Sequence, residues 1–198
     1  MIKRIHSYDD KRFSKKVLQQ HGAFEVDGLL YEVEIISNDE AIVKGSDKYI
    51  LEVIEEFRFY AEHITKFYNE ENICIMEYPK INLFEIELTK IQPSQFYVDE
   101  DKKKQVSNFI YKPEDILIPV MKHNNRFISL DGHTRMSVAI DRGYHSVYGF
   151  ITEAEDYIND FVKEAVRRNI NSPFDMKVIS HQEYDILWNQ FCSEYFDY

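Results

Sequence analysis

The chain has 198 residues, of which 44% are hydrophobic and 15% aromatic, and its net charge is −11. This length allows one domain or a domain with a sizeable extension, and the aromatic content excludes a disordered chain. The acidic balance argues against a protein that binds long nucleic acids, and no apolar run reaches the roughly 18 residues of a membrane span. Cys74 and Cys192 fit no disulfide framework, and residues 1–4 lead into no export signal, so a cytoplasmic location is expected.

The first 80 residues predict an N-terminal module that mixes helix and strand. A short helix is expected over residues 8–21, before Gly22. Asp27-Gly28 separates two apolar runs, which is typical of a β-hairpin, and a third strand is expected over residues 41–44. From residue 47 to residue 68, apolar side chains recur at three- and four-residue intervals, which predicts one long amphipathic helix.

A strand over residues 73–78 and the following Pro79 predict a domain boundary, with domains at 1–80 and 81–198. The second domain alternates strands and helices, and Asn124-Asn125 predicts a hairpin turn within it. The expected strands cover residues 83–88, 115–120, 126–130 and 146–150, and the expected helices cover residues 99–110, 136–142, 153–169 and 181–196. The predicted fold class is therefore α/β (α+β), with a hairpin and long-helix module before the second domain.

The motif Asp131-Gly132-His133-Thr134-Arg135 joins a predicted strand to a predicted helix. It lies in residues 101–150, which hold eight basic and five acidic side chains and form the one net-positive part of an acidic chain. A helix N-terminus attracts anions, a glycine allows a phosphate to approach closely, and an arginine binds phosphate bidentately. A second interpretation is equally open from the spacing, in which Asp131 simply caps the helix and exposed polar residues follow.

Several pieces in a fixed order resemble the ParB/sulfiredoxin superfamily. They are Ile91-x-Pro93-Ser94-Gln95, the strands at residues 116–120 and 127–130, the motif at residues 131–135, and the helix exit at residues 143–147. The resemblance covers roughly residues 84–151. It implies a small α/β domain, a ParB/sulfiredoxin-like fold, that binds a nucleotide with its phosphates at the glycine-containing turn.

The motif is most similar to the free serine kinase branch of that superfamily. The branch normally has a second histidine where this chain has Thr134, and a catalytic glutamate where this chain has Gln95. Sulfiredoxins carry a cysteine at the position of His133, and partition proteins continue into a DNA-binding domain for which the remaining acidic residues are too few. Glutamine cannot act as a general base, so binding is better supported than catalysis.

The resemblance implies that Gly132, His133, Thr134 and Arg135 bind phosphate, that Gln95 lines the pocket, and that Asp131 and His133 act in catalysis. The first hypothesis is a phosphotransferase that uses ATP or ADP with Mg²⁺, acts on a small hydroxylated molecule such as an amino acid, and has no resident metal site of its own. The second is a non-catalytic nucleotide sensor whose N-terminal module binds a protein partner. A third, a DNA-associated protein or nuclease, conflicts with the acidic charge.

Overall fold

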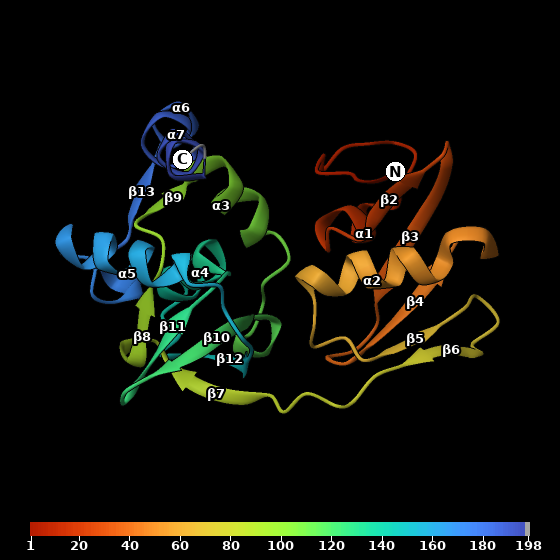
Figure 1. The fold of residues 1–198 in the computed structure, drawn as a ribbon, viewed down its shortest axis with the longest axis horizontal. Coiled ribbons are helices and arrows are strands. Elements are labelled where there is room, and N and C mark those ends of the chain that lie inside the picture. Colours follow the sequence, from red (N-terminus) through yellow and green to blue (C-terminus); the bar gives the residue numbers. More distant parts are fainter. Residues whose placement is uncertain (197–198) are drawn as a thin grey trace. The chain divides into compact units, whose positions relative to one another are not determined.

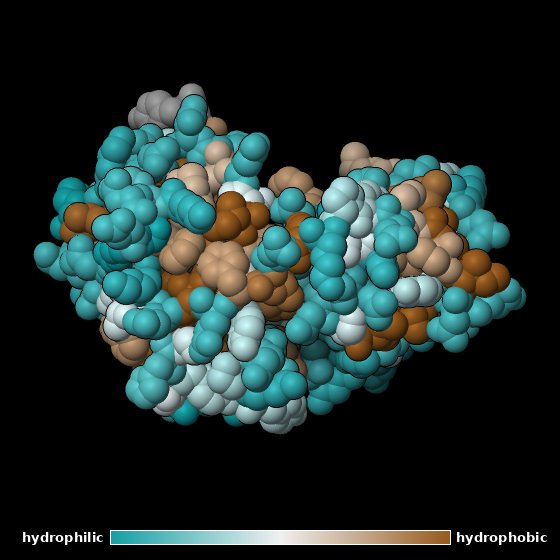
Figure 2. All heavy atoms as spheres, turned by 90° about the horizontal axis from the view of Figure 1, so that it is seen from below, coloured by the Kyte–Doolittle hydropathy of each residue, from teal (hydrophilic) through white to brown (hydrophobic). Residues whose placement is uncertain are grey.

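The computed structural model describes residues 1–196, and the chain divides into two compact units (Figure 1). Unit 1 covers Met1–Ile81 and unit 2 begins at Asn82, which places the division one residue from the predicted boundary. Both units mix helices and strands, which confirms the predicted fold class. No helix within residues 1–196 is long and apolar enough to cross a membrane. On the face drawn in Figure 2, hydrophilic residues surround smaller hydrophobic patches.

Unit 1 is built on a six-stranded sheet in the order β1-β2-β3-β4-β5-β6. Asp27 and Gly28 both have positive φ, 51° and 80°, and they make the predicted hairpin turn between β2 and β3. β4 and β5 pair in parallel, and the other neighbours are antiparallel. The strands are β1 (Ile2–Arg4), β2 (Ala23–Val26), β3 (Leu29–Ile35), β4 (Glu40–Lys44), β5 (Lys66–Tyr68) and β6 (Cys74–Glu77).

Helices pack on both faces of this sheet, because neighbouring residues of a strand point to opposite sides. Phe24 of β2 belongs to the main core, where α2 (Ile50–Tyr60, preceded by the 3₁₀ turn η1, Asp47–Tyr49) inserts Val53, Ile54 and Phe57. Ala23 lies in a smaller cluster on the other face, with Val17 and Leu18 of α1 (Lys15–Gln19).

Two helices predicted in unit 1 are shorter than expected. The first begins only at Lys15, because Ser14 caps it by accepting a hydrogen bond from the Val17 N–H. The second ends at Tyr60, and residues 66–68 instead form β5. Phe67 is fully buried, as the helical spacing required, yet it reaches the core from a strand paired with β4 and β6.

Unit 2 contains a five-stranded sheet in the order β7-β12-β10-β11-β8, in which β10–β12 and β11–β8 are parallel pairs. Asn124 adopts a positive φ of 53° in the predicted turn between β10 and β11. A separate two-stranded parallel sheet joins β9 to β13. The strands are β7 (Phe84–Glu87), β8 (Ile91–Pro93), β9 (Tyr97–Asp99), β10 (Leu117–His123), β11 (Arg126–Ser129), β12 (Ser146–Ile151) and β13 (Lys177–Ile179).

The helices of unit 2 match the predicted order, with changed ends. The helix expected at 153–169 begins only at Tyr157, and the one expected at 181–196 contains a π-helical stretch after residue 184. Ser180 and Glu183 form a capping box at the start of the helix that begins at His181. The helices are α3 (Glu100–Ser107), α4 (His133–Asp141), α5 (Tyr157–Arg167), α6 (His181–Tyr184), the π-helix η5 (Asp185–Asn189) and α7 (Gln190–Phe196), with 3₁₀ turns η2 (Leu88–Lys90), η3 (Pro113–Asp115) and η4 (Pro173–Asp175).

Candidate phosphate site at the start of α4

The candidate site begins where β11 ends and α4 starts, beside the end of the parallel strand β8. Gly132 is the residue before α4, with a left-handed φ of 82°, and no side chain caps the helix. The expectation that Asp131 caps α4 is therefore wrong. A Cβ on residue 132 would lie 2.3 Å from Cγ2 of Ile118, so the turn itself requires glycine. No side chain accepts a hydrogen bond from the first N–H groups of α4, and groups of this kind bind anions at other helix N-termini.

Asp131 and Arg135 form an ion pair one helical turn apart. Nη2 of Arg135 donates to Oδ2 of Asp131 at 3.0 Å, and Nη1 donates to the carbonyl oxygen of Leu117. Desolvation acts to raise the pKa of Asp131, but the Arg135 charge and the Gly132 N–H outweigh it and lower that pKa to about 2. The Asp131 side chain remains 68% exposed, so an incoming anion can compete with it for the guanidinium.

His133 and Thr134 are buried at the start of α4 rather than open to solvent. Nε2 of His133 lies 3.1 Å from Oγ of Ser129 and 3.3 Å from Oγ of Ser94, which connects the ends of β11 and β8. Burial lowers the pKa of His133 to about 4, so the imidazole is neutral at pH 7. The side chain of His133 therefore brings no positive charge to a phosphate, and its observed contacts position the helix start.

Lys102 of α3 is a site residue that the sequence analysis missed. Its charge acts on both Asp131 and His133, lowering the pKa of each group, and its side chain is exposed. The two lysines that follow are engaged elsewhere, because Lys103 pairs with Asp141 and Lys104 pairs with Glu100. Lys102 keeps an exposed side chain, and the packing of α3 against α4 that brings its charge near Asp131 has no signal in the sequence.

Gln95 lies in the loop between β8 and β9, where its side chain is partly buried. Its Nε2 donates to the carbonyl oxygen of Tyr97 and, at 3.1 Å, to the hydroxyl of Tyr184 in α6. Burial raises the pKa of Tyr184 well above its ordinary value, and the charges of Asp99 and Asp131 act in the same direction. Tyr184 is thus a second residue near the site that sequence reasoning missed, and its hydroxyl stays protonated at all ordinary pH values.

Asp99, at the end of β9, is buried and caps α3 by accepting hydrogen bonds from the N–H groups of Asp101 and Lys102. Its second oxygen lies 2.6 Å from Nδ1 of His181, which is 82 positions away in the chain. No signal in the sequence connects these two residues. Among residues 1–196, no group of three or more Asp, Glu, His or Cys side chains is arranged to hold a metal ion.

Comparisons with known proteins add little to this geometry. No family model matches the chain, and no curated protein matches it. The crystal structure of protein Atu1540 from Agrobacterium tumefaciens is similar to half of this chain, with 17% identity and a TM-score of 0.34. The match covers 63% of that protein, so this chain spans less than two thirds of its length. A likeness at this level carries no argument, and the functional conclusion depends on the residues described above.

Proposed function

We propose that unit 2 binds the phosphate groups of a nucleotide at the start of α4, in a ParB/sulfiredoxin-like manner. The observation that carries the proposal is the uncapped N-terminus of α4 flanked by two cations, Arg135 and Lys102. A helix N-terminus stabilises an anion through its free N–H groups and its dipole, and nearby cations add to that attraction. The acidic net charge does not oppose a ligand that needs only these few contacts.

Ligand binding would exchange the partners of Arg135. The Asp131–Arg135 pair is exposed on its acidic side, and pairs of this kind contribute at most about 1 kcal/mol to stability. A phosphate that takes the Asp131 position gains the Nη2 donor and the charge of Arg135 at small cost, while Nη1 stays on the carbonyl oxygen of Leu117. The carboxylate released in this way would then face the phosphate, where it is suited to hold Mg²⁺, since that ion needs only one or two carboxylates beside phosphate oxygens and water. The bound Mg²⁺ would neutralise part of the negative charge of the phosphate groups.

Two lysines of α3 provide a matched test of binding. Lys102→Glu places a negative charge beside Asp131, whereas Lys104→Glu alters a lysine already paired with Glu100. We expect ATP, ADP or CTP with Mg²⁺ to raise the melting temperature of the wild type and of Lys104→Glu. We expect Lys102→Glu to bind about tenfold more weakly, which corresponds to about 1.4 kcal/mol. Equal binding by both variants, or no nucleotide effect on the wild type, would contradict the proposal.

Transfer of the phosphate to a small hydroxylated molecule is the second candidate function. Asp131 is ionised and exposed, so its carboxylate suits orientation of an acceptor hydroxyl. A pKa near 2 makes the Asp131 carboxylate a weak base. Gln95 cannot replace it as a base, because its side chain is uncharged and is hydrogen-bonded to Tyr97 and Tyr184. Incubation with labelled ATP, Mg²⁺ and a panel of amino acids tests transfer, with Asp131→Asn as the control. Binding without turnover would leave a nucleotide sensor as the function.

A further inference from the structure

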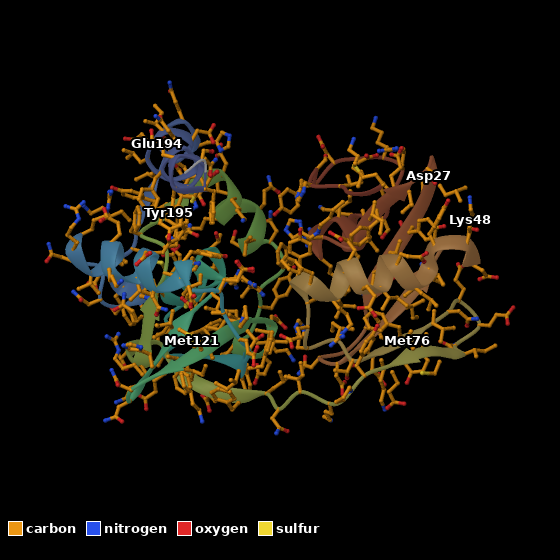
Figure 3. The ribbon with its side chains drawn as sticks, in the orientation of Figure 1. Asp27, Lys48, Met76, Met121, Glu194 and Tyr195 are labelled. Atoms are coloured by element: carbon orange, nitrogen blue, oxygen red, sulfur yellow. The ribbon has the colours of Figure 1, made fainter. Side chains whose placement is uncertain are left out.

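The C-terminal segment, residues 180–196, packs against the stretch that leads from β8 to α3. This stretch consists of the loop at residues 94–96 and strand β9. Trp188 and Phe191 lie edge-on to Phe96 of that loop, with ring centroids 4.9 and 5.3 Å apart. At the other end of the segment, Tyr195 of α7 (Figure 3) donates a hydrogen bond of 2.9 Å to Asp160 of α5. In Figure 1, α6 and α7 lie on the same side of unit 2 as β9, β13 and α3.

One titratable contact joins the start of this segment to β9, the strand that follows the loop. His181 is 60% exposed, and its Nδ1 lies 2.6 Å from the buried carboxylate of Asp99. Its Nε2 lies 3.7 Å from Asp185 in the same segment, and Asp101 of α3 is the third carboxylate that acts on it. The hydrogen bond to Asp99, with these negative charges, raises the pKa of His181, while the same contact lowers the pKa of Asp99 against the effect of its burial.

Both ends of that contact connect to the proposed phosphate site. Asp99 also caps α3, the helix that carries Lys102. Tyr184, three residues after His181, accepts the hydrogen bond from Gln95. The π-helical stretch begins directly after Tyr184, and such stretches are rare in proteins and occur frequently at functional sites.

We propose that the C-terminal segment is a pH-responsive switch, in which the charged His181–Asp99 pair holds the segment against the loop beside the phosphate site. The inference rests on the proposed function, because the switch regulates that same site. With the pair charged, the loop and the capped start of α3 are held for ligand binding. When His181 loses its proton the segment loosens, and both Lys102 and Gln95 lose support.

The direction of the pH effect follows from the two groups. Because folding raises the pKa of His181, its contribution is complete below about pH 6.5 and is lost as the pH rises through the raised value. The lowered pKa of Asp99 adds a contribution that is lost only in acid, as the pH falls through that lowered value. The segment is therefore held most firmly between these limits, and it loosens as the pH rises through the raised pKa of His181.

Trp188 is the one tryptophan of the chain, so its fluorescence reports this segment directly. Using the full chain without nucleotide, we expect the Trp188 emission to shift to the red, and its quenching by acrylamide to increase, from about pH 6 to about pH 9. His123→Gln, at an exposed histidine in the β10–β11 hairpin, is the control and keeps this transition. In His181→Gln we expect no pH transition, with the Trp188 emission red-shifted at every pH because the residue carries no charge. In His181→Lys we also expect no transition, but with the emission blue-shifted at every pH because lysine remains charged. A transition that persists in His181→Gln, or is missing from the wild type, would overturn the switch.

A second arm with Mg²⁺-ADP separates this inference from the proposed function. Binding and segment docking must affect each other equally, so ADP should move the Trp188 transition to higher pH in the wild type. A transition that saturating ADP leaves in place would overturn regulation of the site. Failure of the wild type to bind ADP, ATP or CTP by calorimetry at any pH would instead overturn the nucleotide function.

Discussion

The two units differ in where they keep their polar side chains. Among the described residues of unit 1, few polar groups are buried, among them Thr65 and the hydroxyl of Tyr31, and charges such as Lys16 and Glu34 pair at the surface. Asp27 and Lys48, labelled in Figure 3, likewise belong to its surface. Unit 2 buries polar groups at the strand ends and helix starts around the candidate site. They are Gln92, Ser94, Asp99, Ser129, His133, Thr134 and Ser137.

The buried polar groups of unit 2 gather around the candidate site, whereas the core of unit 1 is mainly apolar. A buried polar group lowers stability unless it is hydrogen-bonded, so a protein gathers such groups where their orientation is needed. In unit 2 the bonds of Ser94, Ser129 and His133 fix the start of α4, and those of Asp99 fix the start of α3. The core of unit 1 is mainly apolar, with the hydroxyl of Tyr31 among its few buried polar atoms.

The largest expected effect comes from the core of unit 1. Phe57 is 1% exposed and packs edge-on between Phe24 and Phe67, so Phe57→Ala should cost about 3–5 kcal/mol. Phe59→Ala, on the exposed side of the same helix, should cost no more than about 0.5 kcal/mol. In urea, Phe57→Ala should move the circular dichroism transition and leave the Trp188 fluorescence midpoint in place. A parallel shift of both signals would show that the units unfold as one.

The next effect concerns the turn before α4. Gly132→Ala combines a positive φ with a contact of 2.3 Å to Ile118, and it should destabilise unit 2 by about 3 kcal/mol or more. Gly143→Ala is the matched control, because its φ is 71° and its Cβ would meet open space. That variant should lose only about 1 kcal/mol. Urea unfolding followed by Trp188 emission measures both, and similar losses would show that the Ile118 contact relaxes easily.

A somewhat smaller effect depends on pH. Folding lowers the pKa of buried His133 from 6.5 to about 4, so its contribution is complete above about pH 6.5 and is lost as the pH falls toward 4. The wild type should therefore lose roughly 2–3 kcal/mol more than His133→Gln between those pH values. Unfolding in urea at a series of pH values gives this difference. Parallel pH profiles would show that His133 titrates normally in the folded chain.

The smallest effect is expected at the surface of unit 1. Lys16 and Glu34 lie 2.7 Å apart, but the lysine side chain is 55% exposed and screened by water. Lys16→Ala should change the free energy of unfolding by about 0.5 kcal/mol or less. Thermal unfolding at low and high salt measures the change. A decrease of more than about 1 kcal/mol in the free energy of unfolding would mean that surface ion pairs contribute substantially to the stability of unit 1.

Local signals were sufficient for much of the fold. Asp27-Gly28 and Asn124-Asn125 marked hairpins because few residues tolerate the positive φ of those turns. The long helix was overextended because Ile64 and Phe67 continue the helical spacing after the chain has left the helix at Ala61. The spacing of apolar residues predicts which side chains are buried but not always the element that carries them. Phe67 is buried as expected, but from a strand that pairs with β4 and β6.

The sequence predicted only part of the candidate site. The turn at residues 131–135 stood out because its residue types suit phosphate and follow a strand. The burial of His133, the partners of Arg135 and the approach of Lys102 arise from contacts between elements distant in the chain. The pair formed by Asp99 and His181, 82 positions apart, is of the same kind. Nucleotide binding stays a prediction that these contacts make more specific.

The parallel pairing of β9 with β13 has a consequence for the order of folding. Tyr97 pairs with Lys177, so the small sheet closes across most of unit 2. Contacts this distant in sequence form slowly, because the intervening chain must first lose its freedom. On the ribosome, β9 has no partner until residues 177–179 have emerged, while the hairpin of β10 and β11 can already form. Synthesis therefore leaves β9, beside the proposed phosphate site, as one of the last parts of unit 2 to take its final conformation.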